Sequence, residues 1–231
     1  MDKKARLTAI ATPIGNFGDL SSRAKLCLSE ADVWFVEDTR VSGQLQRHLE
    51  TNISMKRLDE HSSPYDVQKY ARQILEGNLS ACIVSDAGTP CVSDPGAILI
   101  DSAYDLGIQV ESLPGPSAVS NALVLSGFFA QRYAFLGFLA RKSGAIKKEL
   151  LPYADSSLTL VFFESVHRLD ELLKCCHEVL GERRYAVCRE MTKVHQQVYR
   201  ERLPNMPAEE DILHKGELTL VVEGKRKSPQ N

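Results

Sequence analysis

The chain has 231 residues, of which 43% are hydrophobic and 25% charged, and its net charge is −2. This is ordinary globular composition with enough apolar material for one large or two small cores, so a chain that is disordered along most of its length is excluded. The near-neutral charge excludes a protein that binds nucleic acid through overall positive charge. No apolar run approaches the ~20 residues of a membrane helix.

The N-terminus leads directly into a strand-like segment, without the apolar stretch of a signal peptide. The six cysteines form no C-x-x-C pair and have no zinc-ligand spacing, so we expect free structural thiols in a reducing cytoplasm. These cysteines are Cys27, Cys82, Cys91, Cys175, Cys176 and Cys188.

The first half of the chain alternates short apolar strands with helices, which predicts a parallel sheet covered on both faces. Ser63 and Pro64 illustrate the helix signals, since a serine cap precedes a proline in the first turn. The expected strands are Leu7–Ile10, Val33–Val36, Ile53–Leu58, Ser80–Val84 and Ile108–Leu113. The expected helices follow Ser21 or Ser22, Ser63 and Asp94, and the last two end at Gly77 and Gly107.

The second half predicts a mixed sheet, because the segments Tyr185–Arg189 and His195–Arg200 are too close for a crossover helix and should pair antiparallel. Further strands are expected near Tyr133–Leu139, Leu158–Phe163 and Glu217–Glu223, and helices near Ser117–Ser126, Ile146–Leu151, Arg168–Leu180 and Ala208–Leu213. Leu113–Pro116 interrupts the rhythm and is the expected interdomain joint. We therefore expect two α/β domains, 1–115 and 116–224, and a frayed tail, 225–231.

Polar or Gly/Pro loops follow several predicted strands of the first half. They are Thr12–Asn16, Glu37–Arg40, Ser85–Pro90 and Gly115–Ala118. Because ligands of open parallel sheets bind beyond the carboxyl ends of the strands, these loops predict one binding edge.

Two nucleotide-binding patterns are disfavoured. Gly15, Gly18 and Glu37 imitate the spacing of a dinucleotide fingerprint, but the pattern is G-x-x-G and a proline precedes it. No G-x-x-x-x-G-K-[ST] sequence exists either, which argues against a P-loop.

Charged residues cluster in the second half. Phe162–Arg168 leaves a strand for a helix, and Arg189–His195 joins two strands. These charges are candidates for chemistry, or else their glutamates pair with their arginines and pin strands together. The basic run Arg141–Lys148 and the tail Lys225–Lys227 are able to meet phosphate or simply to be solvated.

Seven motifs, in order over residues 6 to 224, resemble one known family. They are Thr12–Asn16, Glu37–Arg40, Ser85–Pro90 with Ser93–Gly96, Leu113–Ala118, Glu164–Arg168, Arg189–His195 and Lys215–Gly224. Together they resemble the bacterial ribosomal RNA small-subunit methyltransferase I family of the tetrapyrrole-methylase superfamily. This chain departs mildly from that pattern at Val166, Met191, Gln196 and Leu218.

The resemblance implies a tetrapyrrole-methylase-like fold with S-adenosylmethionine in a cleft between the two α/β domains. It implies methylation of the ribose 2′-hydroxyl of a cytidine in the decoding region of 16S rRNA, in the cytoplasm, by a homodimer without metal or membrane contact. The implied cofactor-binding residues are Pro13, Gly15, Asp86, Gly88, Thr89, Pro90, Ser117, Ala118, Phe163, Met191 and Leu218.

A ribose hydroxyl is a weak acid, so a base is expected to help, although water alone would also serve. The candidates for this role are Glu190, Lys193, Glu164 and His167. Lys193 would need a depressed pKa to act as a base. The candidates for RNA contact are Arg40, Arg141, Lys142, Lys147, Lys148, Arg168 and Arg189.

A net charge near zero provides little non-specific electrostatic attraction for RNA, so the expected substrate is the assembled small subunit rather than naked RNA. Two alternatives remain open. The first is a methylase of a tetrapyrrole or other small molecule, which the basic run Arg141–Lys148 fits poorly. The second is a non-catalytic module that binds a nucleotide or a ribosomal partner.

Overall fold

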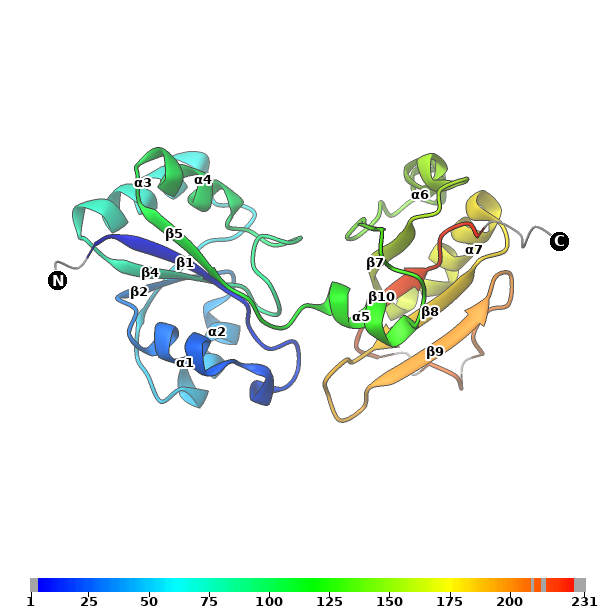
Figure 1. Cartoon of the computed structure of the whole chain (residues 1–231), viewed down its shortest axis with the longest axis horizontal. Helices are drawn as coiled ribbons and strands as arrows, with labels where there is room; N and C mark the ends of the chain where they lie inside the picture. The colour runs from blue at the N-terminus through cyan, green and yellow to red at the C-terminus, as the bar shows by residue number, and fades with distance from the viewer. Residues whose placement is uncertain (1–3, 209, 213–214, 227–231) are drawn as a thin grey trace. The chain divides into compact units, whose positions relative to one another are not determined.

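A computed structural model describes residues 4–208, 210–212 and 215–226. The chain divides into two compact units, Met1–Ser117 and Ala118–Asn231. Each unit contains its own five-stranded sheet (Figure 1). Within the described part of the chain, no helix is both long and apolar enough to cross a membrane.

The sheet of the first unit is parallel throughout, with the strand order β3-β2-β4-β1-β5. Its strands are β1 (Arg6–Ile10), β2 (Val33–Val36), β3 (Ser54–Arg57), β4 (Ser80–Val84) and β5 (Gln109–Leu113). Every residue of β2 and β4 is buried, as the central strands of a sheet covered on both faces should be. The parallel sheet predicted from the alternating pattern is therefore confirmed.

Two helices cover each face of this sheet (Figure 1). The helices are α1 (Ser22–Ser29), α2 (Thr39–His48), α3 (Pro64–Glu76) and α4 (Ala97–Asp105). One core joins α3 and α4 to side chains such as Phe35 and Ile83, and the other joins α1 and α2 to Trp34 and Val84. Successive residues of one strand thus enter opposite cores, which follows from the twofold periodicity of a strand.

Helix α2 was not predicted from the sequence. It begins at the cap Asp38, whose carboxylate accepts a hydrogen bond from the backbone of Arg40 at 2.8 Å. Two of its buried residues, Ser42 and Gln46, are polar, so the apolar spacing that marks a helix is weak. The Gln46 amide compensates for its burial by donating to the Ile53 carbonyl at 2.6 Å.

The sheet of the second unit is mixed, with the order β6-β7-β10-β8-β9. Its strands are β6 (Tyr133–Phe135), β7 (Thr159–Ser165), β8 (Arg184–Arg189), β9 (Gln197–Arg202) and β10 (Glu217–Val222). Only β6 and β7 pair in parallel, whereas the other neighbours are antiparallel. The predicted mixed sheet and the predicted antiparallel pairing of β8 with β9 are both confirmed.

Three helices accompany this sheet, namely α5 (Ala118–Ser126), α6 (Ser143–Leu150) and α7 (Leu169–Leu180). Side chains from α6 and α7 share one core with Tyr185 and Val187. The alternate residue Cys188 faces α5, where its thiol donates to the Ala122 carbonyl at 3.8 Å. The helix expected near Ala208–Leu213 is wrong for the residues described there, because 208 and 210–212 form no helix; Leu213 lies outside them.

Replacement of Leu99 by alanine should destabilise the first unit by about 3 kcal/mol, because this fully buried side chain of α4 leaves a cavity against the sheet. Trp34, the single tryptophan, is fully buried in the same unit, so its fluorescence during denaturant unfolding measures the effect. The neighbouring Ile98 is 51% exposed, and Ile98→Ala should cost less than about 1 kcal/mol. Equal losses for the two variants would contradict this assignment of the core.

Candidate functional site

The carboxyl ends of the first unit's strands carry four loops on one edge of the sheet. All strands of this sheet run in the same direction, so the loops after β1, β2, β4 and β5 leave at the same edge. The predicted convergence of these four loops within the first unit therefore follows directly from the observed topology.

The loops after β1 and β4 are joined by a backbone bridge between Thr12 and Gly88. The Thr12 amide donates to the Gly88 carbonyl at 2.8 Å, and the Gly88 amide donates to the Thr12 carbonyl at 3.1 Å. The Thr12 hydroxyl also donates to the Ser85 carbonyl at 3.2 Å. Gly88 has φ of +86°, and a Cβ there would lie 3.3 Å from the Ile14 side chain, so glycine suits this position for two reasons.

The loop after β5 is tied to the same group. The Thr89 hydroxyl donates to the Pro116 carbonyl at 3.2 Å. A Cβ on Gly115 would lie 3.0 Å from the Cβ of Ala11, so the backbones of β1 and the β5 loop approach too closely for a larger residue. The loops at this edge are thus held together largely by main-chain hydrogen bonds, and glycine at positions 88 and 115 lets their backbones lie close together.

Three carboxyl groups near this edge hold their protons more tightly than usual. Burial raises the pKa of Glu37, of Asp86 and of Asp94, and for Asp94 the value reaches about 6. Their mutual repulsion adds to the effect of burial. The Asp86 carboxylate accepts from the Asp38 amide at 3.2 Å, which links the β4 and β2 loops.

Most of the predicted cofactor-binding residues of the first unit belong to these loops. Pro13 is half-buried and Gly15 is exposed after β1, while Gly88 and Pro90 are buried after β4. The remainder are Asp86, Thr89 and Ser117. Ala118 opens α5 and belongs to the second unit.

Arg40, a predicted RNA contact, is exposed but already paired. Its guanidinium donates to both carboxylate oxygens of Asp38, with Nε at 3.0 Å from Oδ1 and 3.1 Å from Oδ2. Hydrogen bonds from the Arg40 side chain and backbone hold the pKa of Asp38 far below its usual range. Asp38 therefore offsets the charge of Arg40 within the same turn.

In the second unit, the predicted charged cluster assembles at one edge of the sheet. Leu218 at the start of β10 lies opposite Glu164 near the end of β7 and opposite Arg189 at the end of β8. The structure thus brings together the Glu164–Arg168 and Arg189–His195 segments, which are distant in sequence.

Lys193 lies between two carboxylates at this edge. Its ammonium is 2.9 Å from Glu190 Oε1 and 3.0 Å from Glu217 Oε2. The Glu217 amide also donates to Glu190 Oε1 at 3.0 Å. Glu190 has φ of +49°, and a Cβ on Gly216 would lie 2.6 Å from its carboxylate, so glycine makes room for this arrangement.

The arrangement argues against a neutral lysine base. Burial lowers the pKa of Lys193, but the hydrogen bonds to Glu190 and Glu217 outweigh burial and raise it. Burial alone would raise the pKa of Glu190, but the hydrogen bonds from the Glu217 amide and from Lys193 outweigh burial and hold this pKa below its usual value. The depressed pKa that a lysine base requires is therefore absent, and the pair remains a charged one.

Arg168 and Arg189, both predicted RNA contacts, hold the protein's own backbone. Arg168 Nη2 donates to the Leu139 and Ala140 carbonyls at 3.2 and 2.6 Å. It also lies 3.3 Å from the buried Glu164 Oε2, to which it makes no hydrogen bond. Buried Arg189 donates to the carbonyls of Lys215 and His195, so it fixes the loops on either side of the cluster.

The remaining candidates differ in exposure. Leu218 and Met191 are buried, and Phe163 is half-buried, with its ring centroid 4.8 Å from that of Phe135. His167 is exposed in a short 3₁₀ turn after β7. In the basic run, Arg141, Lys142 and Lys148 are exposed, whereas Lys147 lies 2.5 Å from Glu178, whose hydrogen bond raises the pKa of the lysine.

Glu217 was missed as a member of the Lys193 cluster. The sequence does carry a signal for it, because Glu217 opens a predicted strand within the Lys215–Gly224 motif. Across the residues that the structure describes, no group of three or more His, Cys, Asp or Glu side chains is arranged to hold a metal ion.

Comparisons with known proteins agree with this architecture. Residues 6–207 match the family model of the tetrapyrrole (corrin/porphyrin) methylases. Two solved structures, the methyltransferase CobJ and a diphthine synthase, share the fold with TM-scores of 0.70 and 0.71 at 14% identity. CobJ is covered over 98% of both chains, and the diphthine synthase over 95% of this chain and 90% of its own.

Closer relatives are proteins named ribosomal RNA small subunit methyltransferase I. The one from Vibrio cholerae is 41% identical over 95% of this chain and 77% of its own length. The one from Haemophilus influenzae is 39% identical over 97% of this chain and 81% of its own length. The chain therefore belongs to the tetrapyrrole methylase family and, within it, to the ribosomal RNA small subunit methyltransferase I family.

Proposed function

We propose that this protein transfers a methyl group from S-adenosylmethionine to the ribose 2′-hydroxyl of a cytidine in the decoding region of 16S rRNA, with the assembled small subunit as its substrate. The observation that carries the proposal is the 41% identity to a ribosomal RNA small subunit methyltransferase I over almost the whole chain. The net charge of −2 favours a folded particle as substrate over naked RNA. We further propose that the protein acts in the cytoplasm as a homodimer.

The carboxyl edge of the first sheet suits S-adenosylmethionine, which carries an ammonium, a carboxylate, ribose hydroxyls and a sulfonium. The close-packed backbones at Thr12, Gly88 and Gly115 leave few side chains at this edge, and a ligand can approach the main chain at the exposed Gly15 and Gly115. The carboxyl groups of Glu37 and Asp86 accept hydrogen bonds from amines and hydroxyls, and their charge complements a cationic ligand. These features support this edge as the cofactor surface.

S-adenosylmethionine supplies a methyl group on a positively charged sulfur, which is already a good leaving group. The protein must therefore mainly hold the attacking oxygen in line, and such positioning contributes about 7–11 kcal/mol in favourable cases. The hydroxyl must also lose its proton, and relief of the charge that develops on the oxygen accelerates this loss.

In the second unit, the raised pKa of Lys193 suits a cation that stabilises a developing negative charge on the hydroxyl oxygen, or that holds a neighbouring phosphate. Glu190 and Glu217 are positioning residues in this proposal, since their carboxylates orient the ammonium. Glu164 is less suited to accept the proton, because its unbonded oxygen is buried beside Arg168. Its other carboxylate oxygen, Oε1, already accepts from the Ser165 amide at 2.7 Å.

The direct test offers labelled S-adenosylmethionine with unmethylated small subunits, protein-free 16S rRNA and a tetrapyrrole precursor in parallel. Labelled RNA is then digested to nucleosides. We expect label in 2′-O-methylcytidine from the subunit, and at least about tenfold less from protein-free RNA because the folded target presents the nucleotide in position. Label in the tetrapyrrole alone would overturn the proposal, and equal labelling of particle and naked RNA would overturn its substrate state.

Replacement of Gly88 by alanine should weaken S-adenosylmethionine binding at least about tenfold, because the added methyl group lies where the ligand and the Ile14 side chain approach the backbone. Calorimetric titration measures the affinity. Gly107→Ala is the matched control, since Gly107 also has a positive φ of +70° but has nothing within 4 Å of the added Cβ. Equal weakening in both variants would show that backbone strain, and not the proposed cofactor surface, is responsible.

The Lys193 assignment predicts parallel pH profiles. A raised lysine pKa and a lowered glutamate pKa leave both groups charged between about pH 6 and pH 9, so neither titrates in that window. Lys193→Met should lower kcat about 10²-fold by the same factor at every pH in the window, and Lys174→Met, an exposed control, should leave it unchanged. A wild-type rate that climbs with pH, and does so only while Lys193 is present, would identify a neutral lysine base instead.

A further inference from the structure

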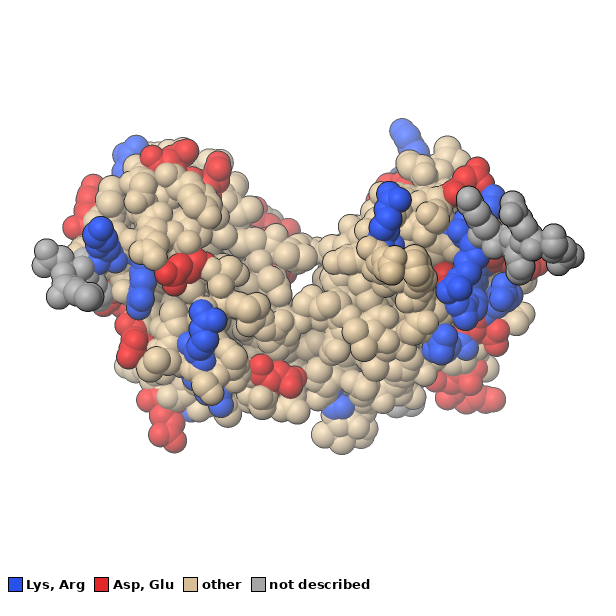
Figure 2. Space-filling view, in the orientation of Figure 1, with Lys and Arg blue, Asp and Glu red and all other residues tan. Residues whose placement is uncertain are grey.

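Basic side chains gather around shallow hollows at the end of the second unit's sheet that lies opposite the Lys193 cluster. At this end β7 and β8 begin, and β9 and β10 end. Figure 2 shows lysine and arginine side chains gathered on this end of the unit, with acidic side chains beside them. We name this area the arginine surface, defined by Arg132, Arg184, Arg200, Arg202, Lys225 and Arg226.

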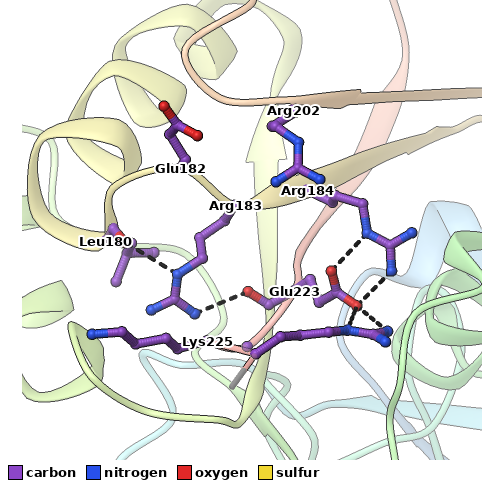
Figure 3. Close-up of a pocket in the computed structure, with 9 residues that line it drawn as sticks. Leu180, Glu182, Arg183, Arg184, Arg202, Glu223 and Lys225 are labelled. Atoms are coloured by element: carbon purple, nitrogen blue, oxygen red, sulfur yellow. Dashed lines mark hydrogen bonds and ion pairs between the residues drawn. The ribbon is translucent and has the colours of Figure 1, made fainter. Parts of the chain in front are cut away.

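The hollows of the arginine surface are contiguous. One, of about 510 Å³, is lined by Arg184, Arg202 and Arg226 among others (Figure 3). A second, of about 310 Å³, shares Arg226 with the first and adds Arg132. A third, of about 370 Å³, shares Arg184 and Arg202 with the first and adds Arg200. A chain-like anion can therefore contact several guanidinium groups in succession.

Among the described residues of this surface, Glu223 is the buried carboxylate, and it is shared by two arginines. Arg184 donates to Glu223 Oε2 at 2.7 Å and to Oε1 at 2.6 Å, and Arg226 Nε donates to Oε1 at 2.6 Å (Figure 3). Burial raises the pKa of Glu223, but the hydrogen bonds from both arginines outweigh it and lower the pKa, so the group stays ionised. One negative charge thus faces two positive ones.

A further positive charge lies beneath the surface. Arg183 is buried, and its guanidinium donates to the carbonyls of Leu180 at 3.1 Å and Ala154 at 2.8 Å. Carbonyl dipoles satisfy its hydrogen bonds without neutralising it, and burial lowers its pKa. Among the described residues, Arg132, Arg200 and Arg202 have no carboxylate within ion-pair distance. Glu182 and Glu201 also line the hollows, and Asp155 pairs with Lys225, so seven cations face four carboxylates among the described residues of this area. Positive charge is therefore in excess here, although the whole chain is slightly negative.

Aromatic residues organise this charge. The ring of buried Phe128 lies 5.0 Å from the Arg184 guanidinium and 5.2 Å from that of Arg200, and such cation–π contacts hold arginines in place before a ligand arrives. The next residue, Phe129, is 57% exposed and lines the hollow with Arg132. Its backbone is anchored, because its carbonyl accepts from the Thr159 hydroxyl at 2.7 Å. An exposed ring on an anchored backbone, among guanidinium groups, is typical of a platform on which an RNA base stacks.

We propose that the arginine surface binds single-stranded RNA, with its guanidinium groups on successive backbone phosphates and Phe129 against a base. The inference rests on the proposed function, since it supplies a docking site for the RNA that carries the methylated nucleotide. It lies on different residues from the Arg141–Lys148 run and from the Lys193 cluster, so it adds a second RNA contact to the same chain. The tail that was singled out in the sequence contributes Lys225 and Arg226, while Lys227 lies outside the described residues.

The test measures binding of a fluorescently labelled single-stranded fragment of 16S rRNA by anisotropy over a series of salt concentrations. The variant Arg132→Gln/Arg200→Gln/Arg202→Gln removes three cations that have no carboxylate to leave unpaired. We expect affinity to fall at least about tenfold, and the slope of log K against log salt to become shallower by about 2. The control Arg23→Gln/Lys25→Gln/Arg72→Gln removes the same charge from exposed positions of the first unit and should change neither by more than about twofold.

Phe129→Ala tests the stacking contact without changing charge. It should weaken binding by about tenfold and leave the salt slope unchanged, whereas Tyr65→Ala, at a 75% exposed ring in α3, should have no effect. Thermal melting confirms that each variant is folded. A triple variant that binds RNA like the wild type, with the same slope, overturns the arginine surface.

Methyl transfer by the same proteins separates the two proposals. Wild-type protein that methylates no RNA overturns the proposed function, whatever the binding data show. Wild-type protein that methylates small subunits, together with a triple variant whose KM for the subunit is unchanged, overturns the docking surface alone. The expected result is a KM raised at least about tenfold with little change in kcat, because phosphate contacts far from the chemistry strengthen binding uniformly.

Discussion

The backbone pairing of Thr12 with Gly88 is the constraint on which the proposed cofactor edge of the first unit depends. The two residues are 76 positions apart, yet the strand order places β1 beside β4, so their loops meet as soon as the sheet forms. The pairing of β1 with β5 in turn lays Gly115 against Ala11, and the pairing of β2 with β4 brings Asp86 within reach of the Asp38 amide. The geometry is therefore carried by main-chain hydrogen bonds, which tolerate change in the surrounding side chains better than a site made of long polar ones would.

The two ends of the second unit's sheet use arginine in opposite ways. At the end of the sheet near Lys193, the guanidinium groups of Arg168 and Arg189 donate to backbone carbonyls of neighbouring loops. At the other end, a single buried glutamate is outnumbered by the guanidinium groups around it. A guanidinium that is saturated by the protein makes a rigid scaffold, whereas one that retains unpaired donors makes a binding surface. Residue type alone does not distinguish these two uses.

This contrast explains what the sequence could and could not predict. The parallel and mixed sheets follow from alternation of strands and helices, and local signals such as the Ser63 cap locate α3. Helix α2 was not predicted, because its buried residues include the polar Ser42 and Gln46 and the apolar spacing typical of a helix is therefore weak. The roles of Arg168 and Arg189 depend on carbonyls that only the tertiary fold brings near, and so does the pKa of Lys193. The resemblance to a known family identified the motifs but not which charges the protein satisfies internally.

The edge strands of the two sheets carry a further consequence. β3 ends in Lys56 and Arg57, and β5 has Glu111 at its centre. β6 is only three residues long, and β9 ends in Arg200, Glu201 and Arg202. Short or charged edges disfavour the addition of a foreign strand, so both sheets are guarded against open-ended self-association. In β9, Arg200 and Arg202 both disfavour the addition of a strand and make the proposed RNA contacts. RNA bound to these arginines would neutralise their charge, and its release would restore the repulsion that disfavours strand addition at β9.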